Sequence, residues 1–121
     1  MNPINNPVNK NISTKFYKLK KKSKKNIITN INDIYNDGVS IITIVRDDNS
    51  IDTVFSYYKN LDLPRKEMII ALNNSACNIE NWLYNSRKYS MIRVYWLNGL
   101  QYGECIEYCV TRSIYNNLIF P

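Results

Sequence analysis

Four short apolar runs recur between Val39 and the end of this 121-residue chain, and polar residues separate each run from the next. They show little alternation of polar and apolar positions, which is typical of strands buried on both faces of a sheet. We therefore predict four buried strands. Their sequences are VSIITIV (39–45), EMIIAL (67–72), IRVYWL (92–97) and NNLIF (116–120).

The stretches between these runs have the apolar spacing of amphipathic helices. The first stripe is formed by Ile51, Val54, Phe55 and Tyr58, after which Pro64 ends the helix. Asn49 and Ser50 are candidates to cap its first turn. The second and third helical stripes consist of Ile79, Trp82 and Leu83, and of Ile106, Cys109, Val110 and Ser113.

The resulting order, β-α-β-α-β-α-β, predicts an α/β fold with a Rossmann-like parallel sheet, right-handed crossovers and helices on its faces. Ligands of such sheets bind beyond the carboxyl ends of the strands. The loops at 46–50, 73–78 and 98–104 are therefore the candidate site. The fourth strand would leave an exposed edge, which is a liability for aggregation or dimer pairing.

Residues 1–38 differ in composition and are predicted to form a polar, lysine-rich arm or linker, with at most a short ordered segment at 31–35. Seven of the sixteen basic residues lie in 15–25, so the remainder is nearly neutral although the net charge is +6. One interpretation is a solvated, disordered arm. The other is a contact for a polyanion through Lys18, Lys20, Lys21, Lys22, Lys24 and Lys25.

The side chains available for chemistry exclude several classes of enzyme and site. The chain has no histidine, which excludes Ser-His-Asp and Cys-His catalysis within it. Its cysteines, Cys77, Cys105 and Cys109, form no CxxC pair and are expected to be reduced, packed thiols. No apolar run reaches the length of a transmembrane helix, and no signal peptide is recognisable, so we expect a cytoplasmic protein.

Several ligand-binding motifs of parallel sheets are also missing. The loop after the first strand reads RDDNS, without the glycines of a dinucleotide-binding fingerprint, and no P-loop sequence occurs. A response-regulator receiver would have an acidic pair where Asp47 and Asp48 stand. Its third strand would also end in an aspartate, whereas this strand ends at Leu97-Asn98.

The stretch VSIITIVRDDNSIDTVFSYYKNLDLPRKEMIIALNNS resembles the start of inverting glycosyltransferases of family 2, which have the GT-A fold. Their usual pattern is VSIIIPTYNR, an amphipathic helix, a proline-containing link and EIIVVDDGS. The stretch IRVYWLNGLQYGECIEYCVTRS is similar to their third strand and following helix. The resemblance covers residues 39–121 and implies a partial nucleotide-sugar-binding domain for a donor of the UDP-sugar type.

Carried over by position, the resemblance implies that eight residues line the nucleotide-sugar site. They are Ile44, Val45, Arg46 and Asp47 after the first strand, Asn73, Asn74 and Ser75 after the second, and Gly103 before the third helix. The family's PTYN is here IVRD, and its acidic pair is Leu72-Asn73. Its helical asparagine and glycine are here Glu107 and Cys109.

Some of these residues, and the two tryptophans, also have simpler structural explanations. Asp47 and Asp48 could cap the first helix, and Asn73 and Asn74 could serve as turn residues. The two tryptophans, Trp82 and Trp96, are better explained as packing residues than as sugar platforms.

The family's DxD motif, which holds a divalent metal, would follow the fourth strand, and the sequence contains no DxD. The resemblance therefore implies a chain truncated before its metal site and inactive alone, with no catalytic residue. Mn or Mg is expected only for a full-length relative. The alternative is a non-enzymatic α/β binding module whose lysine-rich arm engages an anionic partner such as nucleic acid.

Overall fold

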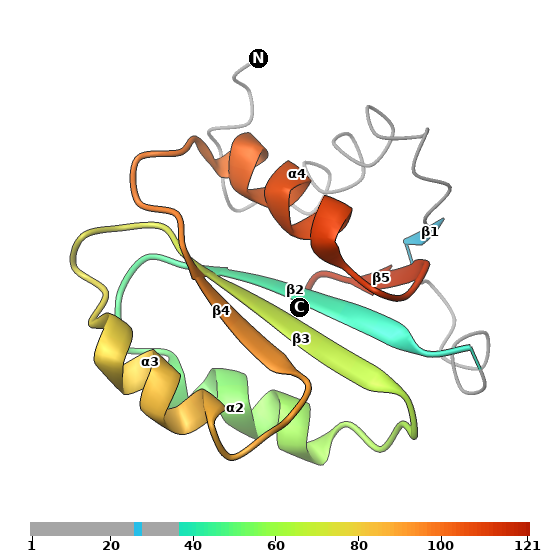
Figure 1. Ribbon diagram of the computed structural model, residues 1–121. Coiled ribbons are helices and arrows are strands. Elements are labelled where there is room, and N and C mark those ends of the chain that lie inside the picture. Colours follow the sequence, from blue (N-terminus) through green and yellow to red (C-terminus); the bar gives the residue numbers. More distant parts are fainter. Residues whose placement is uncertain (1–25, 28–36) are drawn as a thin grey trace.

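The structure, a computed structural model, describes residues 26–27 and 37–121 (Figure 1). Its strands are β1 (Asn26–Ile27), β2 (Val39–Val45), β3 (Lys66–Leu72), β4 (Ile92–Trp96) and β5 (Asn117–Ile119). Its helices are α2 (Ile51–Asn60), α3 (Ile79–Ser86) and α4 (Tyr102–Arg112). From residue 39 onward, the predicted α/β order is confirmed, and β2 has the predicted bounds.

All neighbouring strands pair in parallel, in the order β1-β5-β2-β3-β4. Helices α2 and α3 cover one face of the sheet and α4 covers the other (Figure 1). The chain thus steps outward from β2 to β3 and β4, and then returns through α4 to place β5 on the other side of β2. This confirms the predicted parallel sheet.

The predicted exposed edge on the fourth strand is wrong, because β1 pairs with β5. Asn26 lies opposite Asn117 and Ile27 opposite Leu118. Two residues of the segment predicted as an arm are therefore part of the sheet. The predicted ordered segment at 31–35 and the six candidate lysines at 18–25 lie outside the described residues.

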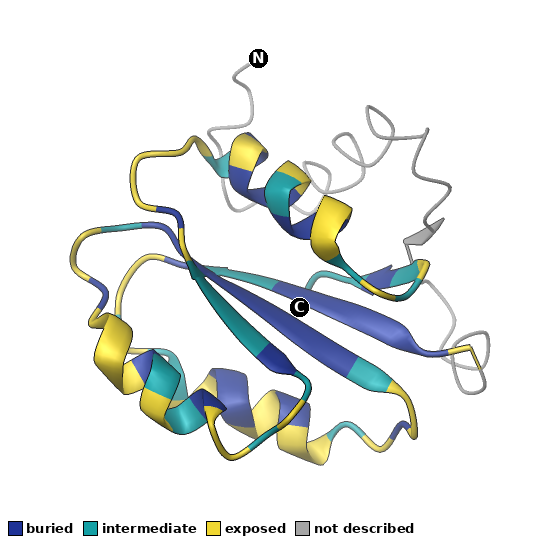
Figure 2. Cartoon of the chain, in the orientation of Figure 1, coloured by how far each residue is buried: buried dark blue, intermediate teal, exposed yellow. Residues whose placement is uncertain are grey.

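The central strands are apolar on both faces, as the sequence predicts, and their residues are almost entirely buried (Figure 2). Successive side chains alternate between the faces because the period of a strand is two. The face under α2 and α3 carries Val39, Ile41, Val45, Met68, Ile70, Leu72 and Ile92. The α4 face carries Ile42, Ile69 and Ala71, against Cys105 and Cys109.

An aromatic cluster joins α2 to α3. Trp82 is fully buried, and its ring lies 5.8 Å from that of Phe55, which stacks in turn on Tyr89. The prediction that Trp82 packs in the core is confirmed. Trp96, at the end of β4, is 43% exposed. No helix in the described residues is long and apolar enough to span a membrane.

A carboxylate, Glu67, is buried on the α4 face near the amino end of β3. It accepts hydrogen bonds from the Ser40 hydroxyl of β2 and the Ile114 backbone N–H, both at 2.5 Å. It also pairs with Arg93 of β4, whose Nη2 lies 2.8 Å from Oε1. Ser40 in turn accepts the backbone N–H of Tyr115 at 3.1 Å. Three strands and the link from α4 to β5 therefore meet at one carboxylate.

Removing the cation from this group should destabilise the fold. In an Arg93→Met variant, Glu67 keeps its burial but loses its charged donor, so we expect unfolding to become easier by on the order of 2 kcal/mol. Urea denaturation measures this change. Arg87→Met, at an exposed position after α3, is the control and should change stability by less than about 0.5 kcal/mol. Equal losses in both variants would contradict a special role for the ion pair.

The three cysteines are free and buried, as predicted. Burial, assisted by the nearby Glu104, raises the pKa of the Cys105 thiol from 9.0 to about 11. Burial also raises the pKa of Cys109 to about 12. Both thiols are therefore protonated and unreactive in the folded protein at neutral pH.

These shifts predict a loss of stability in alkali. Between about pH 9 and pH 12, the unfolded thiols lose their protons while the folded ones keep them, so the unfolded state is increasingly favoured as pH rises. A Cys105→Ala/Cys109→Ala double variant should show a shallower fall in unfolding free energy between pH 9 and pH 11 than the parent protein, measured by urea denaturation. Parallel slopes for the two proteins would contradict the assignment.

Candidate functional site

A cleft of about 440 Å³ lies at the carboxyl edge of the sheet, where the loops after β2, β3 and β4 meet the start of α4. This is the edge at which parallel sheets bind ligands. The lining is mainly polar, with several carboxamides and one charged side chain. It consists of Arg46, Asn73, Asn74, Asn98, Gly99, Leu100, Gln101 and Tyr102.

Asn73 holds this cleft together from its position directly after β3. It is only 6% exposed, and its Nδ2 donates to the carbonyl oxygens of Leu97 and Leu100, each at 2.9 Å. Its backbone N–H donates to the Val45 carbonyl at 2.8 Å. Both amide hydrogens are therefore committed to the loop after β4. Only the Oδ1 acceptor of this side chain is available to a ligand.

Asn74 has a more local role. Its Oδ1 accepts the backbone N–H of Ala76 at 2.9 Å, which is the turn geometry that asparagine favours. The interpretation of Asn74 as a turn residue is thus confirmed, and the same residue also lines the cleft.

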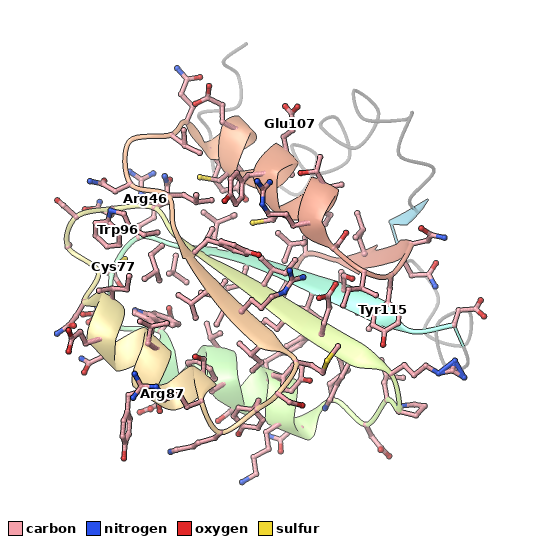
Figure 3. The ribbon with its side chains drawn as sticks, in the orientation of Figure 1. Arg46, Cys77, Arg87, Trp96, Glu107 and Tyr115 are labelled. Carbon is pink, nitrogen blue, oxygen red and sulfur yellow. The ribbon has the colours of Figure 1, made fainter. Side chains whose placement is uncertain are left out.

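Arg46 provides the only formal charge in the lining of the cleft. It follows β2, and its side chain is exposed (Figure 3). Within the described part of the chain it forms no hydrogen bond or ion pair. The first turn of α4 approaches from the opposite side. Its N-cap is Gln101, whose backbone N–H donates to Glu104 Oε1 at 2.8 Å in a capping box. The guanidinium of Arg46 would suit a polar ligand carrying negative charge, whereas the amino end of α4 is already capped by the Glu104 carboxylate.

The two aspartates after β2 do not face the cleft. Asp47 accepts the Asn49 backbone N–H at 2.8 Å. Asp48 reaches α3 instead, where its carboxylate accepts the Asn78 backbone N–H and the Trp82 indole N–H, the latter at 2.8 Å. The expectation that these side chains cap the first helix is wrong for Asp48, because its partners lie 30 and 34 residues further along the chain. The N-cap of α2 is Ser50, without a side-chain hydrogen bond.

The other residues implied by the resemblance lie outside the cleft lining. Ile44 packs towards α4 and Val45 is buried on the opposite face of the sheet. Ser75 is exposed, and Gly103 is buried in the first turn of α4. Of the eight residues, the structure brings together Arg46, Asn73 and Asn74.

Five lining residues, 98–102, carry no individual signal in the sequence. They all lie in the loop at 98–104, which the strand order predicts as part of the site. Burial raises the pKa of the Tyr102 phenol, so it stays protonated and can donate a hydrogen bond. No group of three or more acidic or cysteine side chains that could hold a metal occurs in residues 26–27 and 37–121.

The different roles of the two adjacent asparagines can be tested with the same substitution. Asn73→Asp replaces a double donor by a carboxylate beside two carbonyl oxygens, so we expect a loss of about 2–3 kcal/mol in unfolding free energy. Asn74→Asp keeps the acceptor that the turn requires and should be nearly neutral. Chemical denaturation of both variants measures the difference. Equal stability would show that Asn73 does not hold the loop.

No family model, no curated protein and no solved structure matches this chain. The chemistry of the cleft is therefore inferred from its own residues. They offer one cation, several carboxamides and a protonated phenol, a set suited to a polar anion of moderate size.

Proposed function

We propose that the cleft binds the nucleotide part of a nucleotide-diphospho-sugar, in a domain related to the nucleotide-binding half of family 2 glycosyltransferases. The observation that carries the proposal is the single cation, Arg46, at a carboxamide-rich cleft on the carboxyl edge of a parallel sheet. The sequence resemblance over residues 39–121 supports the nucleotide-sugar in preference to other anions.

The strand order supports the position of the ligand. Because β3 and β5 lie on opposite sides of β2, the chain leaves β2 in one direction and returns on its other side. Open α/β sheets bind their ligands outside the carboxyl ends of the strands, at the point where the strand order reverses. The loop after β2, which contains Arg46, lies at this point.

The size and chemistry of the cleft support the class of ligand. A volume of about 440 Å³ lies within the range of about 300–1,000 Å³ for small-molecule sites. Arg46 would contact the diphosphate, since a guanidinium can pair with two phosphate oxygens at once. Asn73 Oδ1 and the carboxamides of Asn74 and Asn98 would contact the base or ribose.

We propose only that the cleft binds this ligand, and we assign no sugar-transfer step to it. The lining contains no carboxylate, and no metal-ligand cluster occurs in the part of the chain that the structure describes. We therefore assign neither a metal ion nor a catalytic base to the cleft. A consequence is that binding of a nucleoside diphosphate should not require a divalent cation.

Thermal unfolding with UDP, with and without Mn²⁺, tests this proposal. At ten times the dissociation constant, a ligand stabilises by about 1.4 kcal/mol, which raises Tm by about 5–10 °C for a domain of this size. Arg46→Gln should weaken UDP binding by about tenfold or more, because it removes a charged donor. Arg87→Gln, which removes the same charge far from the cleft, should leave binding unchanged (Figure 3).

Two further ligands separate recognition of the nucleotide from recognition of charge alone. Inorganic diphosphate should stabilise the protein less than UDP does, because it makes no base or ribose contact. Equal stabilisation by UDP and inorganic diphosphate would show that the cleft recognises negative charge and not the nucleotide. The absence of any UDP effect at millimolar concentration would reject the proposal, as would equal weakening in the Arg46 and Arg87 variants.

A further inference from the structure

Strand β4 forms one edge of the sheet, and within the described residues its only strand partner is β3. The pairing register runs without interruption from Met68 opposite Ile92 to Leu72 opposite Trp96, so the strand contains no bulge. It also contains no proline and no lysine, two other features by which natural proteins protect exposed edges.

The hydrogen bonds to β3 identify which backbone groups of β4 remain on the open side. The Met91 carbonyl accepts from Met68 N at 3.0 Å, and Leu97 N donates to the Leu72 carbonyl at 2.8 Å. Backbone direction alternates along a strand, so Arg93 and Tyr95 also point towards β3. The N–H and C=O groups of Ile92, Val94 and Trp96 therefore point away from the sheet.

The side chains along this edge are largely apolar. Trp96 is 43% exposed, and Val94 and Tyr95 are half-buried. The one charged residue of the strand, Arg93, is paired with Glu67. An exposed, unprotected edge with an exposed tryptophan is typical of a surface that adds another strand.

We propose that β4 pairs antiparallel with β4 of a second copy of this chain, about a two-fold axis through Val94, so that one sheet continues across the dimer. In this register Val94 faces its own copy and Ile92 faces Trp96. These are the residues whose backbone groups point outward. All three therefore form hydrogen-bonded pairs with the partner strand.

The charges and side chains of β4 favour this register over its neighbours. With the axis at Val94, Arg93 lies opposite Tyr95 of the second copy, so no two like charges face each other across the strands. Moving the axis to Arg93 would set two arginines against each other, which is unfavourable. Moving the axis to Tyr95 would place Ile92 opposite residue 98 of the second copy, which lies beyond the end of β4. The sequence IRVYW is thus self-complementary only about its centre.

Sedimentation velocity of the full chain, from low to high micromolar concentration, tests the proposal. The parent protein should form dimers, and Trp96→Lys should shift it towards monomer because a lysine replaces the exposed apolar side chain of the pairing strand. Tyr84→Lys is the matched control: it changes an aromatic side chain that is 63% exposed on α3, away from the β4 backbone, and should leave dimerisation intact. A parent protein that stays monomeric, or a dimer insensitive to Trp96→Lys, overturns the proposal.

A cysteine cross-link tests the register itself. Directly opposed residues of a hydrogen-bonded antiparallel pair have Cα atoms about 5.5 Å apart, within the range of about 4.4–6.8 Å for disulfides. Val94→Cys should therefore form a covalent dimer under mild oxidation. Trp96→Cys should not, because two copies of residue 96 are separated by about 14 Å along the strands. The native thiols give little background, since all three are buried. Cross-linking of Trp96→Cys but not of Val94→Cys would overturn this register.

Discussion

The buried carboxylate of Glu67 is the interaction on which the arrangement of the sheet depends. The chain must travel from the edge strand β4 over the α4 face to reach the far side of β2. At the end of this path, Glu67 accepts a hydrogen bond from the Ile114 backbone N–H, and Ser40 accepts one from the Tyr115 backbone N–H. Burial of a carboxylate is costly unless its charge is paired and its oxygens accept hydrogen bonds, and Arg93 and Ser40 meet that condition. A return of the chain that removed these partners would leave the buried charge unsatisfied and would therefore be unfavourable.

The return of the chain also produces the cleft. With β5 beside β2, helix α4 spans the sheet and its first turn lies near the carboxyl ends of β2, β3 and β4. Asn73 then fastens the loop after β4 to the end of β3, so that the cleft is built on paired strands. The same topology leaves β4 as an outer edge, which is the basis for the proposed dimer. Cleft and edge are thus two consequences of one strand order.

Much of the fold could be predicted from local pattern, and part of the site could be too. The β-branched run at 39–45 and the stripe from Ile51 to Tyr58 correspond to elements with nearly the predicted bounds. Arg46, Asn73 and Asn74 line the cleft. They lie in the loops at 46–50 and 73–78, which the strand order predicts as part of the site because the carboxyl ends of parallel strands meet at one edge. Asp48 was harder to interpret, since nothing near it in sequence indicates that its partners are Asn78 and Trp82.

The sequence by itself determined the type and order of the elements from residue 39 onward, because the periods of strands and helices are recorded among near neighbours in the chain. It also determined which loops follow the strands. Only the tertiary structure decided the pairing of β1 with β5, the buried contacts of Glu67 and the side chains that line the cleft. The physical reason is distance along the chain: the hydrogen bonds of Asn73 and Glu67 join residues 24 to 47 positions apart. Such partners are chosen by the packing of whole elements, which no local pattern encodes.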